Sequence, residues 1–119
     1  MRPKPTALDL EVFERQAAIC RAFAHPKRLQ LLDMLGRGEE RISSMQKALG
    51  ISKANLSQHL AILRSRQIVV NRKEGNQVFY SIRNPVLVEV LDLMRNYFHS
   101  NLADAIQMLC ELEREAPAQ

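Results

Sequence analysis

One stretch of the chain, SKANLSQHLAILRSRQIV at residues 52–69, combines core-forming leucines with a distinctive set of polar side chains. On a helix, where successive residues are about 100° apart, Leu56, Leu60 and Leu63 share one side. The opposite side carries small or hydrogen-bonding residues: Ala54, Gln58, Ala61 and Ser65, with Asn55 and Ser57 beside them. In a DNA major groove, Asn and Gln bind adenine edges and Ser binds several bases. The stretch therefore predicts a helix that reads nucleic acid.

Basic residues surround this helix. The formal net charge is +4, yet residues 41–83 contain eight Lys and Arg residues and a single acidic residue, Glu74. Residues 84–119 contain two basic and six acidic residues. Such asymmetry is typical of a polyanion-binding module beside a segment with another role. The flanking cations would supply phosphate contacts, which give affinity without sequence information.

Residue sets typical of catalysis are missing from the sequence. It contains no Ser-His-Asp set, no pair of inward-facing carboxylates, no phosphate-binding loop and no H-E-x-x-H motif. The histidines His25, His59 and His99 are scattered, and His25 precedes a proline at a helix boundary. We therefore predict that the protein is not an enzyme and needs no cofactor.

The length and composition predict one cytoplasmic domain. The chain has 119 residues, of which 46% are hydrophobic and 25% charged. No apolar run could span a membrane, and the first residues, MRPKPTALDL, lack the apolar core of a secretory signal. Two cysteines without an export signal favour reduced thiols. We expect a disordered tail over 1–7, a single domain over 8–113 and a frayed tail over 114–119.

Four helices are predicted in the first part of the chain. A helix from Leu8 ends at His25-Pro26, and Pro26 suits the first turn of a second helix that stops at 36–38. A short third helix fits 42–49, with Ser43 or Ser44 as its cap, and Gly50 ends it. Ser52 is the expected N-cap of the fourth helix. Two short helices joined by a glycine-containing turn predict a helix-turn-helix.

A two-stranded hairpin and a long helix complete the prediction. The β run at 68–70 and the alternating residues Val78, Tyr80 and Ile82 flank a turn at 74–76. After Asn84-Pro85, a helix with a continuous apolar stripe runs to about Glu113. At ~1.5 Å per residue this helix is ~40 Å long, more than a small domain can cover. The stripe therefore predicts a dimer through the terminal helices, and packing on its own domain is the alternative.

This order of elements, with the segments HPKRLQLL, LSQHLAIL and EGNQVFYSI, resembles the ArsR/SmtB family of winged helix-turn-helix repressors. The resemblance covers about residues 17–102. It implies a mainly α fold with a small β-hairpin wing, and a homodimer through the first and last helices. It also implies a recognition helix at 52–66 and a wing at 71–77. Arg66-Gln67 departs from the Ala-Gly usual there, and a left-handed cap is less costly with glycine.

The residues and the resemblance together predict the DNA contacts. On the helix they are Ser52, Lys53, Asn55, Ser57, Gln58, His59 and Arg64, and on the hairpin they are Arg72, Lys73, Asn76 and Gln77. His59 lies at the edge of the apolar face, so a half-buried packing role is its alternative.

The metal ligands known in many family members are not found here. The positions of the thiolate pair in the third helix fall on Arg41 and Ser43, and those of the last-helix site fall on Asn84, Val86, Tyr97 and Ser100. His99, Cys110 and Glu113 copy part of the last-helix spacing, but His99 and Cys110 lie ~16 Å apart along one helix. Only two antiparallel chains could join them at a metal. We predict no metal site.

Cys20 and Cys110 could form a thiol switch. They lie on the first and last helices, so pairing of these helices across a dimer could bring them together. The alternative is two buried packing cysteines. No inducer is identified by either alternative.

These observations predict a sequence-specific, DNA-binding transcriptional regulator: a homodimeric repressor that a signal releases from a palindromic operator in double-stranded DNA. The alternative function is a winged-helix protein-interaction module. That module would expose an apolar rather than a polar helix face, which the stretch at 52–69 does not provide.

Overall fold

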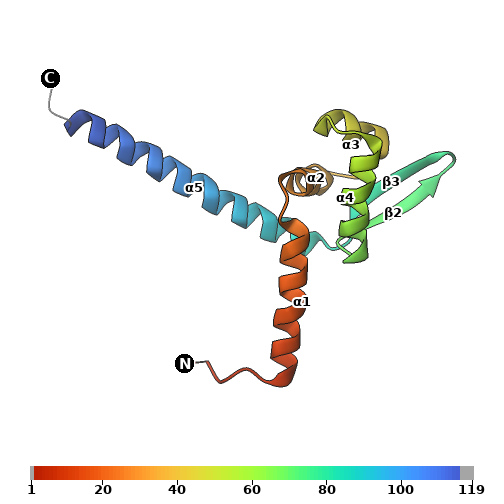
Figure 1. Cartoon of the computed structure of the whole chain (residues 1–119), viewed down its shortest axis with the longest axis horizontal. Coiled ribbons are helices and arrows are strands. Elements are labelled where there is room, and N and C mark those ends of the chain that lie inside the picture. Colours follow the sequence, from red (N-terminus) through yellow and green to blue (C-terminus); the bar gives the residue numbers. More distant parts are fainter. Residues whose placement is uncertain (1, 116–119) are drawn as a thin grey trace. The chain divides into compact units, whose positions relative to one another are not determined.

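The computed structural model describes residues 2–115 as two units, one up to Pro85 and one from Val86 onward. The first unit holds four helices and three strands and the second is formed by one helix (Figure 1). The elements are α1 Ala7–Phe23, α2 Pro26–Gly36, β1 Glu40–Arg41, α3 Ile42–Leu49, α4 Lys53–Ser65, β2 Val69–Glu74, β3 Gln77–Ile82 and α5 Pro85–Glu115.

Local capping explains where α1 and α2 begin. The Thr6 hydroxyl accepts a hydrogen bond from the Asp9 amide at 3.2 Å, and the Asp9 carboxylate accepts one from the Thr6 amide at 2.8 Å. This capping box places the start of α1 at Ala7. His25 caps α2, because its Nδ1 atom accepts a hydrogen bond from the Lys27 amide at 3.0 Å. The predicted helix boundary at His25-Pro26 is confirmed.

The predicted cap of α3 is wrong. The N-cap residue is Arg41, which makes no side-chain cap hydrogen bond, and Ser43 and Ser44 lie inside the helix. The reason is that Arg41 pairs with Phe79 in the sheet, so the chain passes from an extended strand directly into the helix. The predicted caps at Gly50 and Ser52 are confirmed. Gly50 has φ 64°, and the Ser52 hydroxyl accepts a hydrogen bond from the Asn55 amide at 3.1 Å.

The core of the first unit forms where three helices meet the sheet. Helices α2 and α3 contact β3, and α4 contacts β2 (Figure 1). Leucines that recur at helical spacing supply most of the buried side chains, as the periodicity of the sequence indicates. The fully buried side chains are Leu31, Leu32, Met45, Leu56, Leu60, Leu63 and Val69.

The sheet has three antiparallel strands in the order β1-β3-β2, rather than the two predicted. The predicted hairpin β2–β3 is confirmed and turns at Gly75, where φ is 60°. Strand β1 was missed because it is formed by only Glu40 and Arg41, which pair with Tyr80 and Phe79. Two residues are too short for an alternating pattern to be visible.

Helix α5 forms the second unit. It begins at Pro85, as predicted, and continues through Arg114 and Glu115, where a frayed tail was expected; residues 116–119 of that tail lie outside the described residues. A single helix cannot bury its own apolar stripe, so this unit by itself has no core. None of the helices described between residues 2 and 115 is long and apolar enough to cross a membrane.

Candidate nucleic-acid interface

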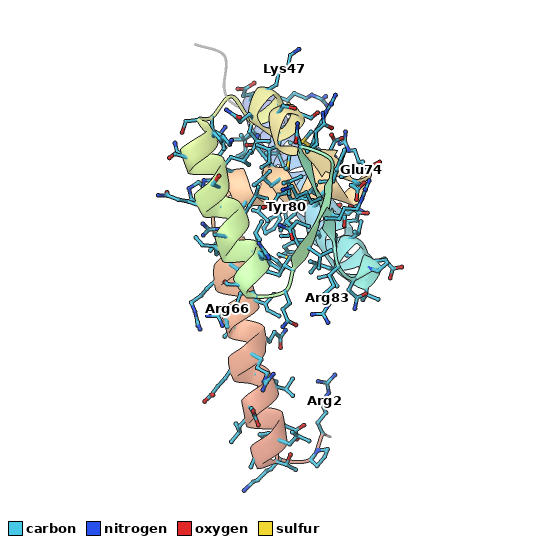
Figure 2. The ribbon with its side chains drawn as sticks, turned by 90° about the vertical axis from the view of Figure 1, so that its right-hand side faces the viewer. Arg2, Lys47, Arg66, Glu74, Tyr80 and Arg83 are labelled. Carbon is cyan, nitrogen blue, oxygen red and sulfur yellow. The ribbon has the colours of Figure 1, made fainter. Side chains whose placement is uncertain are left out.

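Helix α4 presents the polar face that its sequence predicts. Leu56, Leu60 and Leu63 are buried, and they seat the helix against the rest of the first unit. The side chains predicted to contact DNA lie on its solvent side and are exposed: Lys53, Asn55, Ser57, Gln58 and Arg64. No carboxylate lies anywhere between Arg41 and Lys73, so nothing on α4 would repel phosphate. Lys47 on α3 and Arg66 at the end of α4 place cations beyond both ends of this face (Figure 2).

His59 differs from its exposed neighbours on α4. It is half-buried, its ring centroid lies 4.6 Å from that of His25, and its Nδ1 atom lies 3.4 Å from Nη1 of Arg28. Burial lowers the pKa of His59, and the charges of His25 and Arg28 lower it further. These contacts favour the packing alternative for His59.

The wing presents a second polar group at its tip. Lys73, Asn76 and Gln77 are exposed, and the turn at Gly75–Asn76 is flanked by Glu74 and Gln77. An exposed loop tip with a cation and two amides can reach phosphates or a neighbouring groove. Lys73, Asn76 and Gln77 are thus exposed near the tip, and the Gln77 side-chain oxygen accepts a hydrogen bond of 3.5 Å from Nη1 of Arg41.

Arg72 is held by other residues. Its Nε and Nη2 atoms donate to the two carboxylate oxygens of Glu39 at 2.8 and 2.6 Å, and Nη1 donates to Glu74 at 2.7 Å. Its guanidinium also lies 4.6 Å from the ring centroid of Phe79. Arg72 is therefore already engaged by two carboxylates and an aromatic ring.

The connection from α4 into the wing contains a residue in the left-handed conformation that is not a glycine. Gln67 has φ 59°, and its side chain accepts a hydrogen bond from Nη1 of Arg83. A non-glycine residue in this region carries a conformational cost. Where the family usually has Ala-Gly, this chain has Arg66-Gln67, and Gln67 adopts the left-handed conformation that glycine favours. Arg66 is exposed at the C-cap of α4.

The described residues contain no group of three or more His, Cys, Asp or Glu that could hold a metal ion. Cys20 and Cys110 are free thiols, and both are exposed in the isolated chain. The alternative of two buried packing cysteines is therefore not observed in the isolated chain.

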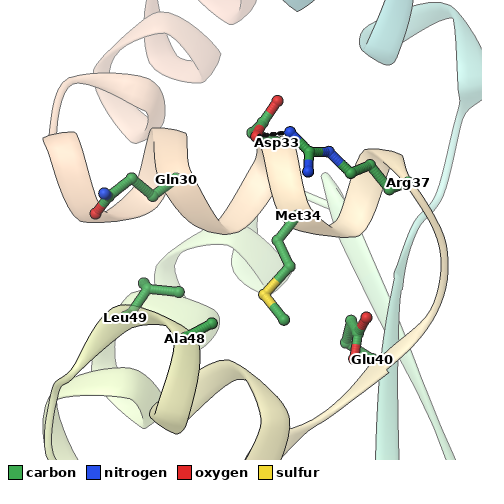
Figure 3. A pocket seen from close by; sticks show the side chains of 7 residues that line it. All are labelled: Gln30, Asp33, Met34, Arg37, Glu40, Ala48 and Leu49. Atoms are coloured by element: carbon green, nitrogen blue, oxygen red, sulfur yellow. Dashed lines mark hydrogen bonds and ion pairs between the residues drawn. The ribbon is translucent and has the colours of Figure 1, made fainter.

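A pocket of about 430 Å³ lies between α2, α3 and β1 (Figure 3). Its wall on α2 includes the ion pair between Arg37 and Asp33, whose atoms are 3.1 Å apart. The remaining lining residues are Gln30, Met34, Glu40, Ala48 and Leu49. The pocket contains none of the residues predicted to contact DNA.

Comparisons with known proteins show similarity to bacterial regulatory proteins. Residues 25–69 match the family model described as bacterial regulatory protein, arsR family. The nodulation protein NolR of Rhizobium meliloti is 30% identical over 107 residues, which cover 90% of this chain and 86% of NolR. The HTH-type transcriptional regulator Rv0081 of Mycobacterium tuberculosis is 29% identical over 102 residues, covering 85% and 90% of the two chains. A solution structure from Mycobacterium bovis, described as a homodimeric winged helix-turn-helix DNA-binding domain, is 25% identical with TM-score 0.76, covering 85% and 94%.

Proposed function

This chain belongs to the ArsR family of DNA-binding bacterial transcriptional regulators, and on that premise we propose that it is a homodimeric repressor of a palindromic operator. The observation that carries the proposal is the exposed face of α4. Apart from Ile62, which is 41% exposed, it is polar or small and free of carboxylates, and it is seated by three buried leucines. Such a face fits a major groove, where Asn55 and Gln58 would read base edges and Ser57 would add a further contact.

Phosphate contacts come from cations around that face. Lys53 and Arg64 on α4 and Lys73 on the wing are exposed and would fix the register of the protein on the duplex. Ser52 has a structural role as the N-cap of α4. The N-terminus of α4 that it caps would lie near a phosphate, because helix N-termini bind anions.

The dimer is proposed from two apolar faces. In the first unit, the N-terminal half of α1 leaves Leu8, Leu10, Val12 and Phe13 more than half exposed. In the second unit, α5 carries an apolar stripe that a single helix cannot cover. Pairing of these faces in a second copy would remove both from water, and the Mycobacterium bovis relative is described as homodimeric. A two-fold dimer predicts half-sites about one helical turn, or a small multiple of it, apart.

Selection from a random-sequence pool of duplexes tests this function. The full-length protein should enrich a palindromic sequence, and its affinity for that duplex should fall steeply as salt rises. Ser57→Ala and Gln58→Ala should weaken binding to the selected duplex, with little effect on a scrambled duplex. Ser100→Ala, on α5, is the matched control. Equal affinity for selected and scrambled duplexes, or a flat salt dependence, would contradict specific recognition.

A thiol-based release signal is the finer part of the proposal. Exposure of both Cys20 and Cys110 in the isolated chain supports it, because reactive thiols must be reachable. Treatment with diamide or a persulfide donor should lower affinity for the selected duplex, and Cys20→Ser and Cys110→Ser should each remove the response. If both variants respond like the wild type, the signal does not act on these thiols.

A further inference from the structure

The ion pair between Glu39 and Arg72 joins two parts of the first unit that are distant in sequence. Glu39 immediately precedes β1, and Arg72 lies in the middle of β2. Two hydrogen bonds of 2.8 and 2.6 Å make the contact bidentate, and Glu74 adds a third bond of 2.7 Å. Isolated surface ion pairs contribute little, but a bidentate pair within a network is the exception.

The sheet register shows that the ion pair between Glu39 and Arg72 crosses the central strand β3. Phe79 on the central strand β3 is paired with Arg72 on one side and with Arg41 on the other. Paired residues share a face of a sheet, and the Arg72 guanidinium lies over the Phe79 ring. The side chain of Arg72 therefore crosses the central strand on this face and reaches Glu39 beside the opposite edge strand.

The same register separates Arg72 from Lys73. Residues along a strand alternate between faces, so Lys73 lies on the face of Val69, and Arg72 lies on the other. Val69 is buried in the core beneath the helices. The Arg72 side chain thus lies on the face of the sheet opposite the core, whereas Lys73 lies on the core side, at the exposed tip.

We propose that the Glu39–Arg72 pair is a strap that positions the wing relative to α3, and that Lys73, rather than Arg72, is the phosphate contact of the wing. The proposal rests on the DNA-binding function proposed above. Strand β1 runs directly from Glu39 into α3, which begins at Ile42. The strap therefore joins the wing to the first helix of the helix-turn-helix, and Glu39 and Arg72 are positioning residues for DNA binding.

The electrostatics agree with a strap between two charged groups. Hydrogen bonds from Arg72 hold the pKa of Glu39 below its ordinary value. Hydrogen bonds to Glu39 and then Glu74 raise the pKa of Arg72. Both groups stay ionised throughout the neutral range. The carboxylates take three of the five N–H groups of this guanidinium, and their two negative charges oppose the approach of a phosphate.

Two conservative variants separate a strap from a phosphate contact. Glu39→Gln keeps the shape but removes the charge, and Arg72→Lys keeps the charge but loses the planar fork. If the pair is a strap, each variant should weaken binding to the selected duplex roughly 3- to 10-fold, and the double variant should be no weaker than either single one. The salt dependence should not change, because no phosphate contact is lost. If Arg72 contacts phosphate, Glu39→Gln should instead strengthen binding by freeing the cation.

Lys73→Gln is the matched variant on the other face. It should lower the slope of log affinity against log salt by roughly 0.9 for each lysine removed. Asp33→Asn, which breaks the ion pair with Arg37, should change neither affinity nor slope. An unchanged slope for Lys73→Gln, or Glu39→Gln binding as tightly as the wild type, would overturn the proposal.

Amide hydrogen exchange tests the strap without DNA. Glu39→Gln and Arg72→Lys should speed exchange at Arg41 and Phe79, where β1 pairs with β3, and leave the core amides of α4 protected. Unchanged exchange at these positions would contradict the strap. If the random pool yields no preferred sequence, the proposed function fails, while this measurement still decides whether the strap exists.

Discussion

The rings of His25 and His59 lie with their centroids 4.6 Å apart, which joins the start of α2 to the middle of α4. His25 is at the same time the cap of α2, and Nη1 of Arg28 lies 3.4 Å from Nδ1 of His59. A proton added to His59 would therefore place a positive charge beside an arginine and a second imidazole. The pKa of His59 is lowered, first by burial and then by these two neighbours.

Stability should fall as the pH is lowered through this histidine's range. The unfolded chain takes up a proton near pH 6.5, whereas folded His59 resists it, so the unfolded state binds more protons. The free energy of unfolding should decrease from about pH 6.5 downward until folded His59 is also protonated, and should be insensitive to this residue above pH 7.5. Urea unfolding between pH 7.5 and 5.0 measures this pH dependence of the free energy of unfolding.

His59→Gln should remove this pH dependence, and His99→Gln, on α5, should not. Hydrogen bonds from Thr6 and Arg72 lower the pKa values of Asp9 and Glu39, respectively. These carboxylates therefore lose their contribution to stability at a lower pH, when the pH falls below their ordinary pKa values. The two windows are therefore separable. An identical pH profile for His59→Gln and the wild type would contradict the interpretation.

Two serines of the same stretch should behave oppositely. Ser52→Ala removes the hydroxyl that accepts the Asn55 amide, and the free energy of unfolding should fall by about 1 kcal/mol. Ser57→Ala lies on the exposed face, so its free energy of unfolding should change by less than about 0.5 kcal/mol while duplex affinity falls. Urea unfolding and duplex binding of both variants measure this contrast. Loss of stability in Ser57→Ala would place that side chain in a structural role.

The left-handed conformation of Gln67 can be measured with a pair of variants. Gln67→Gly and Gln67→Ala both lose the hydrogen bond with Arg83, but only glycine relieves the φ of 59°. The glycine variant should be more stable than the alanine variant by about 1 kcal/mol. Chemical denaturation of the two proteins gives this difference directly. Equal stabilities would mean that the residue does not keep its left-handed conformation in solution.

A charge on the apolar stripe of α5 should dissociate the proposed dimer. Leu102→Asp places a carboxylate on the side shared with Phe98 and Leu109, and burying an unpaired charge is costly. Sedimentation should show a monomer at concentrations where the wild type is a dimer. Ser100→Asp puts the same charge on the opposite side of the helix and should leave the dimer intact. If Leu102→Asp remains dimeric, the interface lies elsewhere.

Much of the fold could be predicted because its signals are local. The leucine periodicity of α4, the glycine at position 50 and the serine at position 52 each act within a few residues, and each is confirmed. The cap of α3 could not be predicted, since it depends on Arg41 pairing with Phe79, far along the chain. The same pairing creates β1, which is too short to leave a pattern in the sequence.

The candidate site is divided in the same way. Exposure of Lys53, Asn55 and Gln58 follows from their helical positions relative to the leucines. The partners of His59 and Arg72 lie on α2 and beside β1, and no spacing within α4 or the hairpin reveals them. The sequence does not show whether a basic residue near a predicted turn is paired with a carboxylate or available to bind phosphate. That distinction needs the positions of the carboxylates in the fold.

The pairing of Glu40 with Tyr80 also determines when the domain can finish folding. The ribosome releases α2, α3 and α4 before β3, so the helical core can collapse from local contacts while β1 is still without its partner. Closing so long a loop costs only slightly more entropy than closing one half its length. Within the first unit, the contact between β1 and β3 should therefore form after the helices, and a nascent chain stalled before β3 should contain the helices but lack the wing.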